Sequence, residues 1–216
     1  MIRALVFDFD GLILDTETPL IDGWIAMHER AGLACSRADA IRAVGHADFD
    51  FDPWAAFGPA ADRAALDHEH RRLTRELTAH QPVLPGVRDY LRVARTRGLK
   101  LGIASNSSYA HVDGHLQRLG LRGLFDLTCC REDAPAPKPA PDLYLTVLNQ
   151  FGTAAREVIA FEDSMAGTQA AKRAGLWTVA VPNVSTRHHD FSAADLVTAS
   201  LAEASLAQLL EHFGNA

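Results

Sequence analysis

Short apolar runs alternate with helix-like stretches over most of the chain after Pro82. The pattern predicts helices over residues 86–97, 109–119, 142–151, 165–174 and 205–213, and strands over residues 99–104, 125–130, 158–161, 178–181 and 196–199. Strands that alternate with helices are joined in parallel by right-handed helical crossovers. The sequence therefore predicts an α/β fold with a doubly wound, Rossmann-like parallel sheet.

The first predicted strand, residues 2–7, is separated from this pattern by a long helical segment. Helices are predicted over residues 18–30 and 63–77, with no convincing strand between them. An insertion at this point lies over the carboxyl ends of the strands, where open α/β sheets bind ligands. We therefore expect an α/β core domain of residues 1–15 and 81–216, and an inserted α-helical cap domain of residues 16–80 that acts as a lid.

Bulk composition excludes several classes of function. A chain of 216 residues with 48% hydrophobic content can bury a substantial core, and a net charge of −6 argues against nucleic acid or an anionic membrane as the main partner. No stretch reaches the roughly 18 apolar residues of a bilayer span, and the N-terminal run has no signal-peptide cleavage site. Three cysteines form neither a disulfide framework nor a zinc pattern. We expect a cytoplasmic protein. The sequence leaves the oligomeric state open and slightly favours a monomer.

The tetrapeptide FDFD occurs twice, at residues 7–10 and 49–52. In the first copy, Asp8 and Asp10 end a buried strand, where carboxylates that share a face of extended chain lie roughly 7 Å apart between Cα atoms. This placement suits two groups that act on one ligand, although a strand-end aspartate can also simply cap a turn. The second copy has no apolar strand before it. We interpret it as a loop between cap helices, with packed phenylalanines and solvated carboxylates.

Polar side chains also follow the later strands. Ser105 and Asn106 stand where a helix begins, and backbone N–H groups there bind phosphate, although a serine can serve only as the helix cap. Lys138 lies between prolines, which stiffen its approach, but most lone lysines are surface charges. Glu162 and Asp163 form a second carboxylate pair. Since parallel strands end at one edge of a sheet, we expect these groups to meet there.

Four acidic side chains gathered at one edge would repel one another and raise their pKa values unless a cation lay between them. Oxygen ligands without histidine or cysteine suit Mg²⁺, which completes its shell with water and substrate phosphate. The sequence therefore predicts a Mg²⁺ site and a small anionic substrate.

Four ordered segments resemble the motifs of the haloacid dehalogenase superfamily. They are FDFDG with DTE within residues 7–17, Ser105-Asn106, KPAPD at 138–142 and EDSMAG at 162–167. The closest resemblance is to the branch that contains β-phosphoglucomutase and many small-molecule phosphatases. It implies a Mg²⁺-dependent phosphatase that acts on a small phosphorylated metabolite, such as a sugar phosphate, below a helical cap.

The resemblance also implies roles for individual residues. Asp8 would attack phosphorus and form an aspartyl-phosphate, and Asp10 would protonate the leaving oxygen and later deprotonate water. The implied phosphate-binding residues are Ser105, Asn106 and Lys138, and the implied metal ligands are Asp8, the Asp10 carbonyl group, Asp163 and, in an assisting role, Glu162.

Some positions depart from this branch. Leu20 stands where the β-phosphoglucomutase pattern has a cap histidine, and the Gly45 region lacks the basic residue that the branch uses on a second phosphate. Mutase activity is therefore disfavoured, but a sugar-phosphate isomerase stays an alternative, with His46 as a substitute. Pro137 stands where glycine or serine often precedes the motif lysine, which could alter the approach of Lys138.

Two alternatives come from other classes of protein. A 2-haloacid dehalogenase would use Asp8 but needs neither Asp10 nor Mg²⁺, and a phosphorylated receiver module needs no cap. His111 and His115, at i and i+4 of a predicted helix, could bind a metal, but we expect them to face solvent. Three aromatic residues of the cap could line its inner face or pack in its core: Trp24, Trp54 and Phe57.

Overall fold

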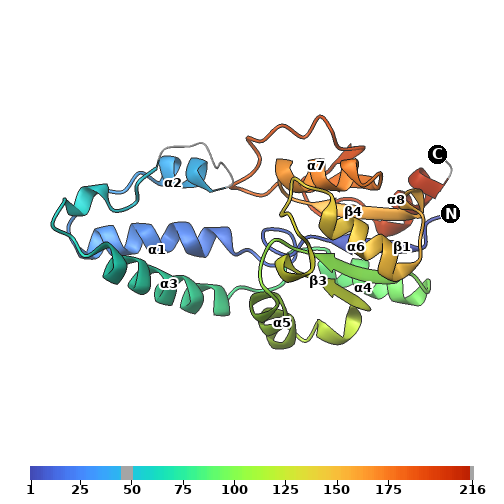
Figure 1. Ribbon diagram of the computed structural model, residues 1–216, viewed down its shortest axis with the longest axis horizontal. Helices are drawn as coiled ribbons and strands as arrows, with labels where there is room; N and C mark the ends of the chain where they lie inside the picture. The colour runs from blue at the N-terminus through green and yellow to red at the C-terminus, as the bar shows by residue number, and fades with distance from the viewer. Residues whose placement is uncertain (45–50, 215–216) are drawn as a thin grey trace.

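The computed structural model describes residues 1–44 and 51–214. Six parallel strands form one sheet in the order β3-β2-β1-β4-β5-β6 (Figure 1). The strands are β1 (Ala4–Phe7), β2 (Lys100–Ala104), β3 (Leu127–Cys129), β4 (Val158–Glu162), β5 (Trp177–Ala180) and β6 (Leu196–Val197). The predicted doubly wound α/β fold is confirmed.

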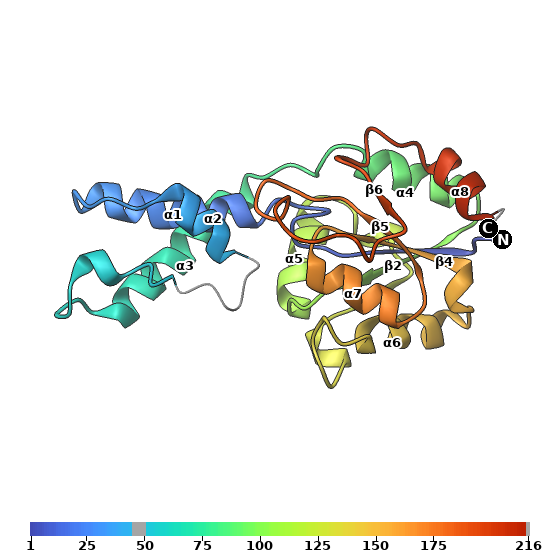
Figure 2. The same ribbon diagram turned by 90° about the horizontal axis from the view of Figure 1, so that it is seen from above.

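Helices cover both faces of this sheet, with α4 and α8 above it and α6 and α7 below it in Figure 2. Side chains alternate along each strand, so Leu5 and Phe7 of β1 pack in one hydrophobic cluster while Ala4 and Val6 pack in the other. An apolar strand is therefore buried on both sides. The helices are α4 (Val87–Thr96), α5 (Tyr109–Arg118) and α8 (Leu206–Gly214) on the first face, and α6 (Asp142–Phe151) and α7 (Met165–Arg173) on the second.

The strand order reverses at β1, which has β2 on one side and β4 on the other. Phe7 at the end of β1 is in register with Ile103 of β2 and Phe161 of β4. The residues that follow these three strands therefore emerge side by side. Open α/β sheets bind ligands at such a reversal point, outside the carboxyl ends of the strands.

A helical extension projects from the core between β1 and α4 (Figure 1). It contains α1 (Glu17–Arg30), α2 (Arg37–Ala43) and α3 (Arg63–Ala79), and the described residues between 16 and 80 form no strand. The sequence pattern did not indicate α2. The fold with an inserted helical cap is confirmed, while the boundaries at residues 16 and 80 stay a prediction.

The cap has its own small hydrophobic cluster of Met27, Trp54 and Leu73. Trp54 is only 4% exposed, and its indole Nε1 donates to Asp67 Oδ1 at 2.7 Å. Trp24 and Phe57 pack against the same cluster. Of the two interpretations of these aromatic residues, core packing within the cap is therefore the one that the structure supports.

Of the second FDFD, Phe51 and Asp52 are described. The Phe51 ring packs 5.3 Å from the Trp24 ring, and the exposed Asp52 pairs with Arg63 at 2.6 Å. Both contacts agree with a structural rather than a chemical role. The predictions for Gly45, His46 and the start of this FDFD lie outside the described residues.

None of the helices in the described ranges has the length and apolar content of a bilayer span.

Candidate active site

Asp8 and Gly11 shape the chain immediately after β1. The buried Asp8 extends the pairing with β4, since its N–H donates to the Phe161 carbonyl at 2.9 Å. Gly11 has a φ of +75°, in the left-handed region that favours glycine, and a Cβ there would lie 2.3 Å from Asp163 Oδ2. The absence of a side chain at residue 11 thus lets the turn close over the acidic groups.

Lys138 reaches the end of β1 from the loop before α6. Its Nζ lies 2.6 Å from Asp8 Oδ1, from Glu162 Oε1 and from the Ala104 carbonyl, and its side chain is 4% exposed. Burial alone would lower the pKa of the Lys138 amine, but the charges of Asp8 and Glu162 outweigh burial and raise it. Lys138 therefore stays charged and faces inward, and Pro137 does not keep it away.

Asp8, Glu162 and Asp163 gather beside this lysine. Each offers a carboxylate oxygen within 4.8 Å of the others, and all three are buried. Burial, followed by the charges of Glu162 and Asp10, raises the pKa of Asp8 to about 7, although Lys138 opposes the shift. Burial and the charge of Asp8 raise the pKa of Asp163 well above its usual range. One lysine thus does not compensate the negative charge that the three carboxylates would carry when all are ionised.

This donor set fits a divalent cation. Glu162 Oε2 is buried without a hydrogen-bond partner, and a buried acceptor with no donor is costly. A cation would satisfy that oxygen and relieve the repulsion that raises the pKa values of Asp8 and Asp163. Carboxylate oxygens are hard ligands of the kind that Mg²⁺ prefers.

The side chain of Glu162, the last residue of β4, contacts two helices. Its Oε1 accepts a hydrogen bond from the Tyr144 hydroxyl of α6. A Cβ at residue 167 of α7 would lie 1.8 Å from Glu162 Oε2, so only glycine leaves room for this carboxylate. Ser164 caps α7, since its Oγ accepts from the Gly167 N–H at 3.1 Å. The EDSMAG segment therefore combines a strand end, a helix cap and a gap for a buried side chain.

The half-buried side chain of Asp10 points away from the carboxylate cluster, toward Ser107 and His111. Ser107 Oγ donates to Asp10 Oδ2 at 2.6 Å, and His111 Nε2 donates to Asp10 Oδ1 at 2.8 Å. Burial favours a higher pKa of Asp10, but the hydrogen bond and charge of His111 and the hydrogen bond of Ser107 outweigh it and lower the pKa. Each carboxylate oxygen of Asp10 thus accepts a hydrogen bond, which fixes the orientation of the side chain.

The expectation that His111 faces solvent is wrong. Ser108 caps α5, and the first turn of this helix begins next to the end of β1, so His111 meets Asp10. The hydrogen bond to Asp10 raises the pKa of His111 in spite of burial. His115, one turn later, is half-buried against the Phe9 ring, and burial lowers its pKa.

Ser105 and Asn106 follow β2, as predicted. Ser105 is buried, and its Oγ accepts from the Ser107 N–H at 3.0 Å. Asn106 Oδ1 accepts from the Lys138 N–H at 2.9 Å, and its Nδ2 donates to the Lys138 carbonyl at 3.4 Å. This reciprocal pair ties the end of β2 to the lysine loop, so Asn106 helps to place Lys138.

Three neighbours of the site were missed from the sequence. Asn183 Nδ2 donates to Asp163 Oδ2 at 2.8 Å and to the Gly11 carbonyl at 3.3 Å. Asn183 follows β5, so the rule of polar residues after strands would have found it. Ser107 lies in the polar segment that follows β2, so the same rule applies to it. Tyr144 is an internal helix residue with no sequence signal.

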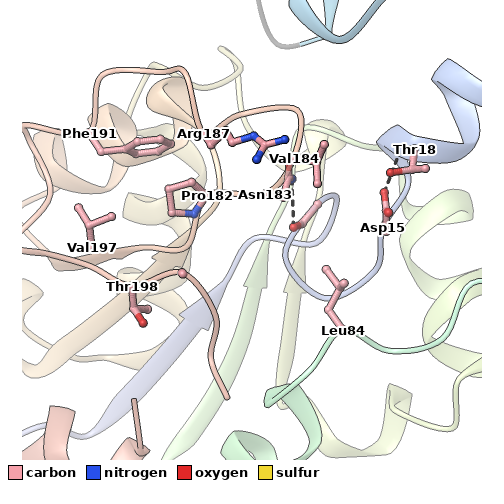
Figure 3. A pocket seen from close by; sticks show the side chains of 12 residues that line it. Asp15, Thr18, Leu84, Pro182, Asn183, Val184, Arg187, Phe191, Val197 and Thr198 are labelled. Carbon is pink, nitrogen blue, oxygen red and sulfur yellow. Dashed lines mark hydrogen bonds between the residues drawn. The ribbon is translucent and has the colours of Figure 1, made fainter. Parts of the chain in front are cut away.

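Two cavities lie beside the turn at Gly11. The larger, about 620 Å³, has Asn183 and Arg187 on one side and Asp15 and Thr18 on the other (Figure 3). None of the three clustered carboxylates lines either cavity. The second cavity, about 370 Å³, lies between core and cap and is lined by Asp10. The second cavity is therefore the one that brings a ligand to Asp10, two residues after Asp8.

Glu17, at the start of α1, also lines the second cavity. Burial raises its pKa to about 7, and its Oε2 is buried without a hydrogen-bond partner. Other residues from the two sides of the cavity are Ser107, His111 and His115 from the core, and Leu20, His70, Arg71 and Arg75 from the cap.

The model of the haloacid dehalogenase-like hydrolase family matches residues 2–175. The chain belongs to this family. The haloacid dehalogenase resemblance in the sequence is thereby confirmed, and so is the prediction of an enzyme of the phosphoric monoester hydrolase class, because relatives of this hydrolase are named phosphatases.

Individual relatives align with this haloacid dehalogenase-like hydrolase over nearly its whole length. "Putative phosphatase YhcW" of Bacillus subtilis is 38% identical, over 100% of this chain and 99% of that protein. Hexitol phosphatase B of Escherichia coli is 31% identical, over 97% of each. The crystal structure of CbbY from Rhodobacter sphaeroides in complex with phosphate is 26% identical, with a TM-score of 0.74 over 97% of this chain and 99% of that chain.

Proposed function

We propose that this hydrolase is a Mg²⁺-dependent phosphatase that releases phosphate from a small phosphorylated metabolite, a sugar phosphate or a similar ester. The observation that carries the proposal is the position of Asp8, beside the charged Lys138 and within the same cluster as Asp163, two residues before Asp10, which lines a cavity. The names of the relatives, one of them a hexitol phosphatase, support this substrate class.

The proposed reaction has two steps, and both pass through Asp8. In the first, a carboxylate oxygen of Asp8 bonds to phosphorus while the ester P–O bond breaks, and Asp10 gives a proton to the leaving oxygen. In the second, water gives a proton to Asp10 and attacks the phosphorus of the aspartyl-phosphate. The bond between phosphorus and Asp8 breaks, which restores the carboxylate and releases phosphate.

Neighbouring groups prepare both acids for these roles. Lys138 keeps a positive charge next to Asp8 and, with Ser105 and Asn106, is proposed to bind the phosphoryl oxygens. Ser107 and His111 hold the two oxygens of Asp10, which fixes the direction in which it can give its proton.

The proposed metal ligands are Asp8, Asp163, Glu162 and the carbonyl group of Asp10. The unpartnered Glu162 Oε2 and the raised pKa values of Asp8 and Asp163 support a cation among them. When bound, Mg²⁺ would neutralise negative charge on the carboxylates and on the phosphoryl group.

The test is phosphate release from sugar phosphates, phosphoglycolate and nucleoside monophosphates, with Mg²⁺ and with EDTA. We expect wild-type protein to require Mg²⁺ and Asp8→Asn to lose about 10³-fold or more of the activity. Asp89→Asn is a matched control, because that carboxylate of α4 is 75% exposed. Full activity of Asp8→Asn, or no release from any ester, would refute the phosphatase.

Two alternatives have distinct products. A 2-haloacid dehalogenase would release chloride from a haloacid without Mg²⁺. A sugar-phosphate isomerase would interconvert glucose phosphates in the presence of a bisphosphate activator. Leu20 lines the cavity in place of a histidine, which favours hydrolysis over transfer.

A further inference from the structure

Helix α3 contains four arginines, and they fall into two groups. Arg63 pairs with Asp52 at 2.6 Å, and Arg72 pairs with Glu69 at 2.7 Å. Arg71 and Arg75 form no ion pair with any carboxylate in residues 1–44 and 51–214. The two unpaired arginines are the two that line the 370 Å³ cavity.

The spacing of Arg71 and Arg75 places them together. Residues at i and i+4 lie on one face of a helix, one turn apart. Thr74 and Thr78 line the same cavity, while Leu73 packs into the hydrophobic cluster of the cap. The helix therefore presents an apolar side to the cap interior and a polar, cationic side to the cavity.

The same cavity is also lined by groups of the opposite charge. They are Asp10 and Glu17, and an anionic group of a ligand would be repelled by both in their ionised form. A ligand with a second anionic group must therefore place that group away from these acids. Arg71 and Arg75 offer the positive charge that it needs, in a cavity of the size that holds a small metabolite.

We propose that Arg71 and Arg75 form a subsite for a second anionic group, so that the preferred substrates carry a phosphate or a carboxylate at the end remote from the scissile ester. The proposal rests on the proposed phosphatase function and defines its substrate class. Guanidinium groups bind both kinds of anion through paired, charge-assisted hydrogen bonds. A neutral substrate end makes no such bonds and leaves both arginines in water.

The test compares substrates that differ at the remote end. Fructose 1,6-bisphosphate is compared with fructose 6-phosphate, and 6-phosphogluconate with glucose 6-phosphate, by steady-state phosphate release. In wild-type protein we expect kcat/KM to be higher for the substrate with the second anion in at least one pair. Arg71→Gln and Arg75→Gln should each lower that ratio about tenfold, the usual effect of one charge-assisted hydrogen bond.

Arg72→Gln is the matched control, because Arg72 lies on the same helix with its charge already paired. It should leave the ratios unchanged. A lowered ratio in the fructose pair alone would assign the subsite to phosphate, and one in the glucose pair alone to carboxylate. Unchanged ratios in the Arg71→Gln/Arg75→Gln double variant, or an equal fall in Arg72→Gln, would overturn the proposal. Failure of the phosphatase itself is distinguishable, because no substrate would then release phosphate.

Discussion

Glu162 occupies its position because residue 167 has no side chain. A methyl group there would overlap Oε2 of Glu162, a member of the carboxylate cluster. The requirement for glycine at this point of α7 is thus set by a contact with a strand, and not by backbone conformation.

Gly167→Ala should therefore destabilise the protein, although alanine is the better helix former. We expect a loss of about 2 kcal/mol in the free energy of unfolding, typical of overpacking, together with a fall in activity. Urea denaturation measures the first effect and phosphate release the second. Gly114→Ala in α5 is the control, because nothing lies within 4 Å of the added atom, and it should raise stability by roughly 0.5–1 kcal/mol. Equal stability of the two variants would contradict the overlap.

His111 should set the pH dependence of Asp10. Its hydrogen bond and charge stabilise the Asp10 carboxylate, so His111→Leu should raise the pKa of Asp10. Because Asp10 must hold a proton to protonate the leaving oxygen, the basic limb of the kcat/KM profile should move to higher pH. His115→Leu, one turn away, should leave that limb in place. A profile that stays fixed in His111→Leu would exclude this role for the histidine.

At the scale of residues, the sequence predicted the groups that follow strands and missed those that approach from elsewhere. Asp8, Lys138 and Asp163 were predicted to meet, because parallel strands end at one edge. His111 and Tyr144 reach the acids from helices, and their direction depends on how each helix packs on the sheet. Spacing along the chain does not contain that information.

At the scale of elements, the helices and strands with strong periodicity were predicted within a few residues. Helix α2 was missed, since Arg37–Ala43 is short, contains only one buried residue, and owes part of its stability to the Ser36 cap. Helix α3 was predicted as a helix over residues 63–77, but its division into an apolar side and a cationic side depends on contacts with α1 and with the core. The cap therefore could be predicted as helical but not as a binding surface.

Leu73→Ala should loosen the cap while the core stays folded. Among the described residues of the cap, Leu73 belongs to a cluster of three buried side chains, so its loss should cost about 2–5 kcal/mol locally. Hydrogen exchange should rise in α1 and α3 and stay unchanged in β1 and β4. Leu145→Ala in α6, where the leucine is 48% exposed, is the control. Equal exchange increases in cap and core would contradict a cap with its own hydrophobic cluster.

At the scale of the whole molecule, the buried acids link stability to pH and to metal. The pKa of Asp8 is about 7 in the folded protein and 3.8 ordinarily, so the folded state binds more protons between these values. Its stabilising contribution is complete below pH 3.8 and is lost as the pH rises through about 7. Glu17, also raised to about 7, acts in the same direction. Without metal, these groups should make the protein less stable at pH 8 than at pH 5.5.

Mg²⁺ should restore stability at pH 8. A ligand at a hundred times its dissociation constant adds about 2.7 kcal/mol to the free energy of unfolding. We expect the thermal midpoint at pH 8 to rise with Mg²⁺ concentration in wild-type protein and to be insensitive to Mg²⁺ in Asp163→Asn. In EDTA, Asp163→Asn should be the more stable of the two, by about 1 kcal/mol, because it removes a carboxyl group whose ionisation is made unfavourable by burial and by the charge of Asp8. A metal response that survives in this variant would remove Asp163 from the ligand set.

Helices α1 and α3 both meet the core at the same end of the extension (Figure 1), where Arg118 donates to the carbonyls of Thr78 and Gln81. An arm attached at one end amplifies any rotation about that pivot. Since α3 is about 25 Å long, a turn of about 10° would swing its far end by about 4 Å but would shift Arg75, one helical turn from the pivot, by only about 1 Å. A small rotation would therefore move the far end of α3 by several ångströms while the guanidinium group of Arg75, near the pivot, keeps nearly the same position relative to the core.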